Sequence, residues 1–234
     1  MRKRKRLPQI ISQRELSKIL HYVLSPKNRK RKFTKGGKFE RIRNCMIFIL
    51  MYYLGLRPKE SMAIKISHID FNSQQLFIPA ENNKQRHADK LPIPNFIFDK
   101  ILQYISKTKK DGYYSEEWLF PSNHWRTRDG RPLRGTITRC FKKALQDSKL
   151  LHLSYTDDQG KPRYNITLYS LRHSFGTRVL QVTKSYKKTA MALRQRDDQY
   201  RSVFVYDHTT DYLDRSDIFK EVYFTEKEKR QPPI

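Results

Sequence analysis

Cysteine is scarce in this sequence, and so are apolar runs long enough to span a bilayer. Only Cys45 and Cys140 occur in 234 residues. Each lies in an apolar helical pattern, so we expect two reduced core residues of an intracellular protein. The apolar run at residues 46–54 is too short to cross a membrane. The basic N-terminus leads into no apolar signal-peptide stretch. We expect no membrane segment and a cytoplasmic location.

Metal ligands and acidic residues are also under-represented. The seven histidines form no ligand-spaced pair with cysteines or carboxylates, so we expect no metal site. Lysine and arginine total 49 against 23 acidic residues, a formal charge of +26. With 12% aromatic residues in a folded chain, this excess favours a nucleic-acid partner. A basic RNA-binding protein and a membrane-surface protein are the alternatives that charge alone leaves open.

The length and the periodicity predict a mainly α fold with a small antiparallel β-sheet. At 234 residues the chain can bury one core. Apolar spacing predicts helices at 40–54, 136–146 and 184–193, and one capped by Asn95 whose apolar face includes Leu102. Runs at 76–79 and 90–94 read as a hairpin, and 27–38 and 155–163 as loops. A first helix has a capping box at Ser12 and Glu15 and an apolar stripe of Leu16, Ile19, Leu20, Val23 and Leu24.

One segment, residues 168–180, carries an arginine beside an apolar stripe. At helical spacing, Leu168, Leu171, Phe175 and Val179 face a core, and Arg172 projects from the edge of that face. A guanidinium in such a place is costly unless a carboxylate or another anion meets it. A phosphate would serve.

A second arginine stands where one helix ends and the next begins. Gly55 is a natural helix stop, and Pro58 suits the first turn of the following helix. Arg57 therefore lies near free backbone N–H groups that favour an anion. Glu60, three residues later, can pair with Arg57 and hold it. An ordinary surface Arg/Glu pair is the alternative interpretation.

These two segments resemble the arginine boxes of a known family. Residues 171–177, Leu-Arg-His-Ser-Phe-Gly-Thr, look like the second arginine box of the tyrosine recombinases, the lambda-integrase, Xer and Cre group. Residues 53–60, Tyr-Leu-Gly-Leu-Arg-Pro-Lys-Glu, look like the first. Two boxes in the right order are more specific than either alone. The resemblance implies the catalytic-domain architecture over residues 8–215, after a basic arm at 1–7 and before a C-terminal helix and tail at 216–234.

The same resemblance assigns roles to particular residues. Arg57 and Arg172 would bind the scissile phosphate, and Tyr206, within Tyr206-Asp207-His208, would be the nucleophile, with Tyr212 as the next candidate. Lys84 in the hairpin would be the general acid, with Lys90 as runner-up. Tyr169 stands where the family usually has histidine. Supporting roles fall to two residues, Glu60 and His173.

The closing box departs from the family pattern. The family's Gly-His pair is missing, and Asp197 stands nine residues before Tyr206, where its charge would repel a phosphate. Either Arg194 or Arg196 replaces that donor after a small shift in alignment. With Arg201, these arginines are predicted to bind DNA.

The resemblance implies a site-specific recombinase or integrase that breaks and rejoins DNA through a 3′-phosphotyrosine intermediate. The covalent bond conserves the energy of the broken one, so neither metal nor cofactor is expected. The predicted partners are double-stranded DNA of the nucleoid and further copies of the chain, a homo-tetramer on DNA. The alternative is a catalytically impaired DNA-binding relative, favoured by the departures at Tyr169 and Asp197.

Overall fold

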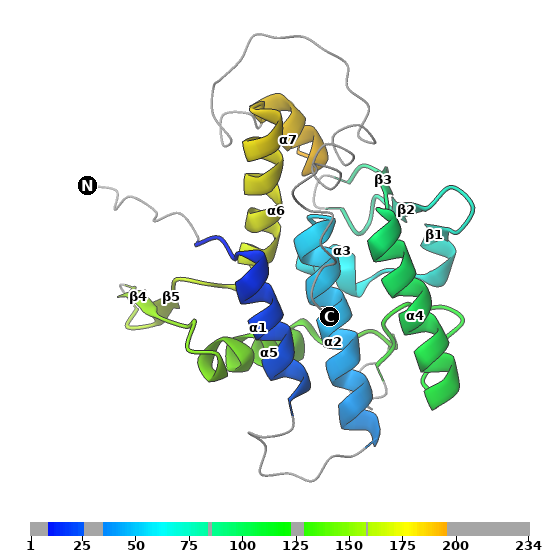
Figure 1. Cartoon of the computed structure of the whole chain (residues 1–234), viewed down its shortest axis with the longest axis horizontal. Helices are drawn as coiled ribbons and strands as arrows, with labels where there is room; N and C mark the ends of the chain where they lie inside the picture. Colours follow the sequence, from blue (N-terminus) through cyan, green and yellow to red (C-terminus); the bar gives the residue numbers. More distant parts are fainter. Residues whose placement is uncertain (1–8, 26–34, 84–85, 123–128, 158, 196–234) are drawn as a thin grey trace.

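The computed structural model describes residues 9–25, 35–83, 86–122, 129–157 and 159–195 (Figure 1). Within these ranges the fold is mainly helical with two small antiparallel sheets, which confirms the predicted fold class. The helices are α1 (Gln13–Leu24), α2 (Lys35–Tyr53), α3 (Pro58–Met62), α4 (Asn95–Asp111), α5 (Arg134–Asp147), α6 (Leu168–Thr183) and α7 (Tyr186–Ala192). The strands are β1 (Ile69–Asp70), β2 (Gln75–Ile78), β3 (Asp89–Pro92), β4 (Leu153–Thr156) and β5 (Pro162–Tyr164).

Helix α2 forms the centre of the core. Every residue from 43 to 54 is buried, and α1, α3, α4 and α6 all contact α2 (Figure 1). The prediction of a core-crossing helix is therefore confirmed. Among the described residues, no helix is both long enough and apolar enough to cross a membrane.

The start of α2 differs from the prediction. The helix begins at Lys35, so the prediction of a loop at 27–38 is wrong for its last four residues. The ring of Phe39 stacks on Tyr113, with centroids 4.5 Å apart, and Arg41 Nε donates to the Gly37 carbonyl at 2.9 Å. These contacts extend the helix beyond the apolar run that the sequence displays.

The first helix follows its local signals closely. Ser12 Oγ accepts from the Glu15 N–H at 3.2 Å, and Glu15 Oε2 accepts from the Ser12 N–H at 2.8 Å, which confirms the capping box. The predicted stripe is buried except for Leu24, which is 38% exposed because the helix ends there.

In α4 the predicted apolar face is largely confirmed, because Phe98 and Ile101 are buried and Ile105 packs against the core, but its cap and one of its residues differ. Asn95 is the first helical residue and Pro94 occupies the cap position, so the predicted Asn95 cap is wrong. Leu102, predicted to face inward, is 41% exposed, whereas Ile97 and Tyr104 are buried. Helix α4 packs against α2 with this buried face.

The strands form two separate hairpins. In the first, β2 pairs with β3 as predicted, with Leu76 opposite Leu91, and β1 adds a third strand. The predicted loop at 155–163 is a turn in its middle, but its ends, residues 155–156 and 162–163, belong to the paired strands β4 and β5, so the prediction is wrong for those ends. Asp157 closes the turn, because its N–H donates to the Lys161 carbonyl at 2.9 Å and its carboxylate accepts from Arg163 Nη2 at 2.7 Å.

A glycine allows α6 to pack on the end of α2. Gly55 has φ +60°, and a Cβ added there would lie 2.3 Å from Cδ1 of Phe175 in α6. Only glycine satisfies both the left-handed backbone and this close approach. The contact places the middle of α6, including Arg172, against the segment that leads from α2 to α3.

Replacing Gly55 by alanine is expected to lower the free energy of unfolding by about 2–5 kcal/mol, because left-handed strain and an overpacked ring add together. Gly112, at φ +78° with open space around its Cα, is the matched control. Gly112→Ala should cost about 1–2 kcal/mol, since only the backbone term applies. Urea denaturation of both variants measures the difference, and equal losses would contradict the close-packing argument.

Candidate active site

A single buried carboxylate, Glu60, organises the site. Arg57 caps α3, and Glu60 lies in its first turn. Glu60 Oε2 accepts from the Arg57 backbone N–H at 2.7 Å, and Glu60 Oε1 accepts from Arg57 Nη1 at 2.6 Å. The predicted pairing is therefore confirmed. The Glu60 side chain is 1% exposed and that of Arg57 is 13% exposed, so the pair is mostly shielded from water and opens outward through Arg57.

Arg172 reaches the same place from α6. Its Nη1 donates to the Gly55 carbonyl at 2.5 Å and lies 3.8 Å from Glu60 Oε2. Its Nη2 donates to the Leu193 carbonyl. These carbonyls follow the last residues of α2 and α7, where helix dipoles present partial negative charge. Arg57 and Arg172, which are distant in sequence, thus converge beside one carboxylate.

Arg194 joins this cluster from the end of α7. Its Nη2 lies 2.6 Å from Glu60 Oε2 and donates to the Gly55 carbonyl at 3.3 Å. The side chain is 1% exposed. The prediction that Arg194 binds DNA stays a prediction, and in the structure its bonded partner is Glu60. Three guanidinium groups around one carboxylate leave a formal charge of +2. We refer to Arg57, Glu60, Arg172 and Arg194 as the arginine cluster.

The pKa shifts reflect this crowding of positive charge. Burial lowers the pKa values of Arg172 and Arg194, and the neighbouring guanidiniums lower them further. Burial alone would raise the pKa of Glu60, but the charges of Arg194, Arg172 and Arg57 outweigh it and hold that pKa below its usual range. Glu60 is therefore ionised, and arginine stays protonated. The cluster keeps an excess of buried positive charge that an anion would relieve.

Two further predicted residues flank Arg172 on α6. Tyr169 is 40% exposed, and the Arg134 guanidinium lies 5.7 Å from its ring centroid. His173 is exposed. Partial desolvation and the charge of Arg172 lower its pKa, which favours the neutral imidazole at pH 7. Both side chains lie beside the cluster, and their catalytic and supporting roles remain predictions.

Several predicted residues lie outside the described part of the chain. They are the acid candidate Lys84, the nucleophile candidates Tyr206 and Tyr212, and the DNA-binding candidates Arg196 and Arg201, as well as the arm at 1–7 and the tail at 216–234. Lys90 is described and exposed on β3.

Asn83, immediately before Lys84, is a site residue that the sequence analysis missed. Arg57 Nη1 donates to Asn83 Oδ1 at 3.4 Å, and Asn83 Nδ2 donates to the His87 carbonyl at 2.8 Å. The β2–β3 hairpin therefore leads into the arginine cluster. An asparagine between two strands normally indicates only a turn, so no local signal distinguished it.

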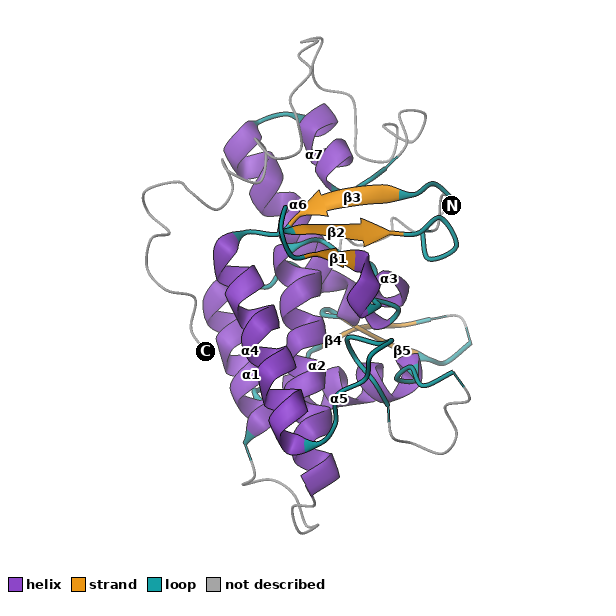
Figure 2. Ribbon diagram, turned by 90° about the vertical axis from the view of Figure 1, so that its right-hand side faces the viewer, coloured by secondary structure: helices purple, strands orange, loops and turns teal. Residues whose placement is uncertain are grey.

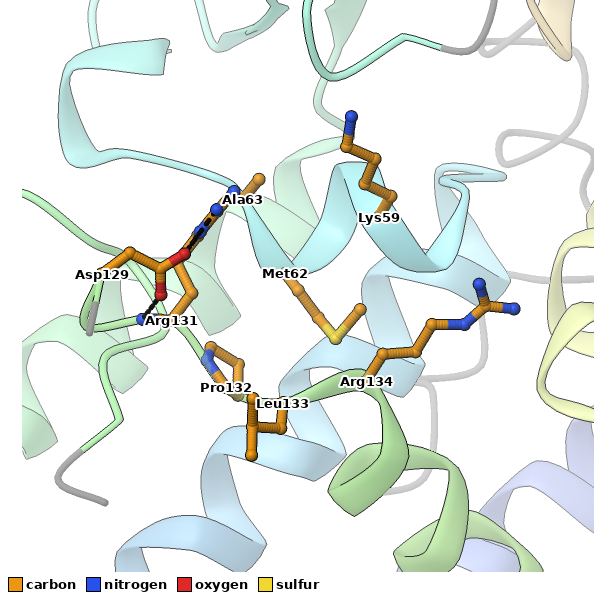
Figure 3. Close-up of a pocket in the computed structure, with 8 residues that line it drawn as sticks. All are labelled: Lys59, Met62, Ala63, Asp129, Arg131, Pro132, Leu133 and Arg134. Atoms are coloured by element: carbon orange, nitrogen blue, oxygen red, sulfur yellow. Dashed lines mark hydrogen bonds and ion pairs between the residues drawn. The ribbon is translucent and has the colours of Figure 1, made fainter. Parts of the chain in front are cut away.

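A pocket of about 300 Å³ lies between α3, the helix that carries Glu60, and the start of α5 (Figure 3). Its apolar floor includes Met62, and Lys59 rises from the same helix as Glu60. Asp129 is bound by Arg131 at 2.8 Å. Apart from this Asp129–Arg131 pair, the charged residues that line the pocket are Lys59 and Arg134, both positive. The lining residues are Lys59, Met62, Ala63, Asp129, Arg131, Pro132, Leu133 and Arg134.

The sequence profile of the Phage integrase family matches residues 10–209. The chain therefore belongs to this family, the tyrosine recombinases. It is 25% identical over 177 residues to tyrosine recombinase XerC of Halalkalibacterium halodurans and 27% identical over 177 residues to tyrosine recombinase XerA of Thermococcus onnurineus. Those matches cover 75% and 76% of this chain but only 50% of each relative.

The fold agrees with this assignment. A crystal structure of XerH site-specific recombinase bound to palindromic difH substrate, a post-cleavage complex, matches with a TM-score of 0.60 at 16% identity. The match covers 88% of this chain and 51% of that one. The fold predicted from the two arginine boxes is thus confirmed.

Glu60→Gln is expected to lower the free energy of unfolding at pH 7 by about 3–5 kcal/mol, because three buried cations lose their counter-charge. Since the folded-state pKa of Glu60 is lowered, its stabilisation is present above the unfolded-state value of about 4.3 and is lost as the pH falls below it. The gap between wild type and variant should shrink on acidification. Chemical denaturation at pH 7 and pH 3.5 measures it.

The matched control is Glu15→Gln. Glu15 occupies the same position in the capping box of α1 but contacts no arginine cluster, and glutamine preserves a capping box. The free energy of unfolding of Glu15→Gln should fall by less than about 1 kcal/mol, as expected for an exposed surface contact. If the Glu60 variant lost no more than this, Glu60 would be a cap alone.

Proposed function

We propose that this chain is the catalytic part of a DNA breaking-and-rejoining enzyme, a site-specific recombinase or integrase. The observation that carries the proposal is the convergence of Arg57 and Arg172, from the two predicted boxes, beside Glu60. Paired guanidiniums with excess positive charge match a phosphodiester, because each planar guanidinium can donate two parallel hydrogen bonds to the non-bridging oxygens. The proposed catalytic unit spans residues 8–215.

The reaction proposed here needs a nucleophile and an acid in addition to the cluster. The Tyr206 hydroxyl loses its proton to solvent, the tyrosinate oxygen attacks the scissile phosphorus to form the new P–O bond, and the bond to the 5′ oxygen breaks. A tyrosine hydroxyl has a pKa near ~10, and adjacent cations make its ionisation easier. Lys84 gives its proton to the departing 5′ oxygen. The 3′-phosphotyrosine then reacts with a second 5′ hydroxyl, which reverses the step.

The proposed partner is duplex DNA, held by several copies of the chain as a homo-tetramer. In Figure 2, α3, the turn between β2 and β3, and the β4–β5 hairpin lie on the same side of the molecule. The positive rim of the pocket, with Lys59 and Arg134, continues this side away from the cluster and suits a phosphate backbone. Such a partner places the protein inside the cell, at the nucleoid.

A suicide substrate, nicked so that the cleaved end diffuses away, tests the chemistry. The wild type should become covalently attached to DNA, and Tyr206→Phe should abolish attachment while retaining salt-sensitive DNA binding. Tyr212→Phe is the matched control and should react normally. Arg172→Lys should react at least ~100-fold more slowly, because it loses the planar fork. Retention on DNA without any attachment would instead identify a catalytically impaired binding relative.

A substrate with sulfur in place of the scissile 5′ bridging oxygen tests the acid. Thiolate leaves without a proton, since a thiol has a pKa near ~8.5. Lys84→Ala should slow cleavage of ordinary DNA by ~10²–10⁴-fold and cleave the sulfur substrate like wild type. Lys90→Ala should behave like wild type on both. The opposite pattern would assign the acid to Lys90.

A further inference from the structure

Arg194 occupies a backbone position that usually belongs to glycine. Its φ is +54°, its N–H donates to the Met191 carbonyl at 2.9 Å, and the Gln195 N–H donates to the Ala190 carbonyl at 2.9 Å. This pair of bonds is a Schellman ending of α7, in which the left-handed residue is normally glycine. A bulky side chain there is strained, and such strain persists where other contacts hold it.

Those contacts are made by the Arg194 side chain. Nη2 lies 2.6 Å from Glu60 Oε2 and 3.3 Å from the Gly55 carbonyl oxygen. Its Nε and Nη1 are buried and have no hydrogen-bond partner among the described residues. A buried guanidinium with two unsatisfied donors is costly. Placing this extra positive charge beside Glu60 therefore costs both backbone strain and the desolvation of a guanidinium.

The consequence concerns the other two arginines. Arg194 is the nearest partner of Glu60 Oε2, whereas Arg172 lies 3.8 Å from that oxygen and is held by backbone carbonyls instead. Arg57 Nη1 binds the other oxygen of Glu60, Oε1, at 2.6 Å. We propose that Arg194 is a positioning residue that offsets the charge of Glu60, so that the cluster presents a net charge of +2 to the reacting phosphate. This inference rests on the proposed function.

The charge of the cluster then matches the transition state better than the substrate. A phosphodiester carries one negative charge, and attack by a tyrosinate adds a second as the new P–O bond forms. The pentavalent species therefore carries two, until the electron pair of the breaking bond leaves with the 5′ oxygen and receives a proton. The cluster carries +2, and without Arg194 it would carry +1. Arg194 therefore stabilises the transition state more than bound DNA.

The test compares two suicide substrates, one ordinary and one with a methyl group replacing a non-bridging oxygen of the scissile phosphate. The methyl group removes one negative charge from both substrate and transition state. Arg194→Gln should slow covalent attachment to ordinary DNA by about 100-fold, while DNA affinity changes little. On the methylated substrate the defect should fall below about 10-fold. Arg194→Lys, which keeps the charge, should lose less than Arg194→Gln on ordinary DNA.

Arg178→Gln is the matched control. Arg178 lies on α6, donates from Nη2 to the Tyr52 carbonyl at 2.6 Å and packs 3.9 Å from the Tyr52 ring centroid. Any loss from this structural arginine should be equal on the two substrates. The same equality for Arg194→Gln, or no loss at all, would overturn the assignment.

A measurement without DNA separates this inference from the proposed function. Sulfate, a dianion, should raise the thermal unfolding midpoint of the wild type saturably, compared with chloride at equal ionic strength. The saturable part of the rise should be lost in Arg194→Gln and kept in Arg178→Gln, whereas the general, non-saturating salting effect of sulfate is common to all three proteins. A saturable rise that persists in Arg194→Gln would refute the role of Arg194. Should the wild type attach to neither DNA substrate, the proposed function fails. The sulfate result then decides on its own whether Arg194 supplies the charge that binds a dianion.

Discussion

The buried carboxylate of Glu60 is the constraint on which the site depends. Its side chain is 1% exposed, and a lone buried carboxylate would be protonated rather than charged. Cations from three places in the chain keep it ionised, Arg57 at the start of α3, Arg172 in α6 and Arg194 after α7. The site therefore forms only when these elements have packed together. Packing of these elements and assembly of the arginine cluster are therefore coupled.

Backbone carbonyls at helix ends complete the arrangement. The Gly55 carbonyl accepts from both Arg172 and Arg194, and the Leu193 carbonyl accepts from Arg172. These carbonyls carry partial rather than full negative charge. They can orient the Arg172 guanidinium without cancelling it, whereas a second carboxylate would bring the cluster down to +1. Backbone carbonyls thus orient the Arg172 guanidinium, and the Glu60 carboxylate is the group that offsets positive charge.

The parts of the fold that sequence analysis predicted are those set within one or two helical turns. The capping box at Ser12, the helix stop at Gly55 and the pairing of Arg57 with Glu60 all depend on neighbours three or four residues away. The Asn95 cap and the ends of the loop at 155–163 failed on local grounds, but two other failures depend on distant partners. The exposed position of Leu102 reflects packing of α4 on α2, and the early start of α2 reflects the stacking of Phe39 on Tyr113.

The same division holds for the site. Its two arginine boxes are contiguous sequence motifs and could be recognised. The contacts of Arg194 with Glu60 and of Asn83 with Arg57 join residues from separate elements, so no motif predicts them. Sequence analysis predicted Arg194 near a phosphate only because the Gly-His pair is missing and a nearby arginine could replace its donor. Its bond to Glu60 follows from the left-handed end of α7, which an arginine at that position gives no reason to expect.

Two kinds of positive charge therefore serve different purposes in this chain. The overall excess of +26 belongs to the whole chain, and salt screens solvent-exposed charges beyond roughly 8 Å at physiological ionic strength. It can attract any polyanion but cannot select one phosphate. The arginine cluster is small and mostly buried, so salt screens it far less. In the proposed function, attraction to the duplex and stabilisation of the reacting phosphate would therefore respond differently to salt, because bulk solvent reaches only the charges that attract the duplex.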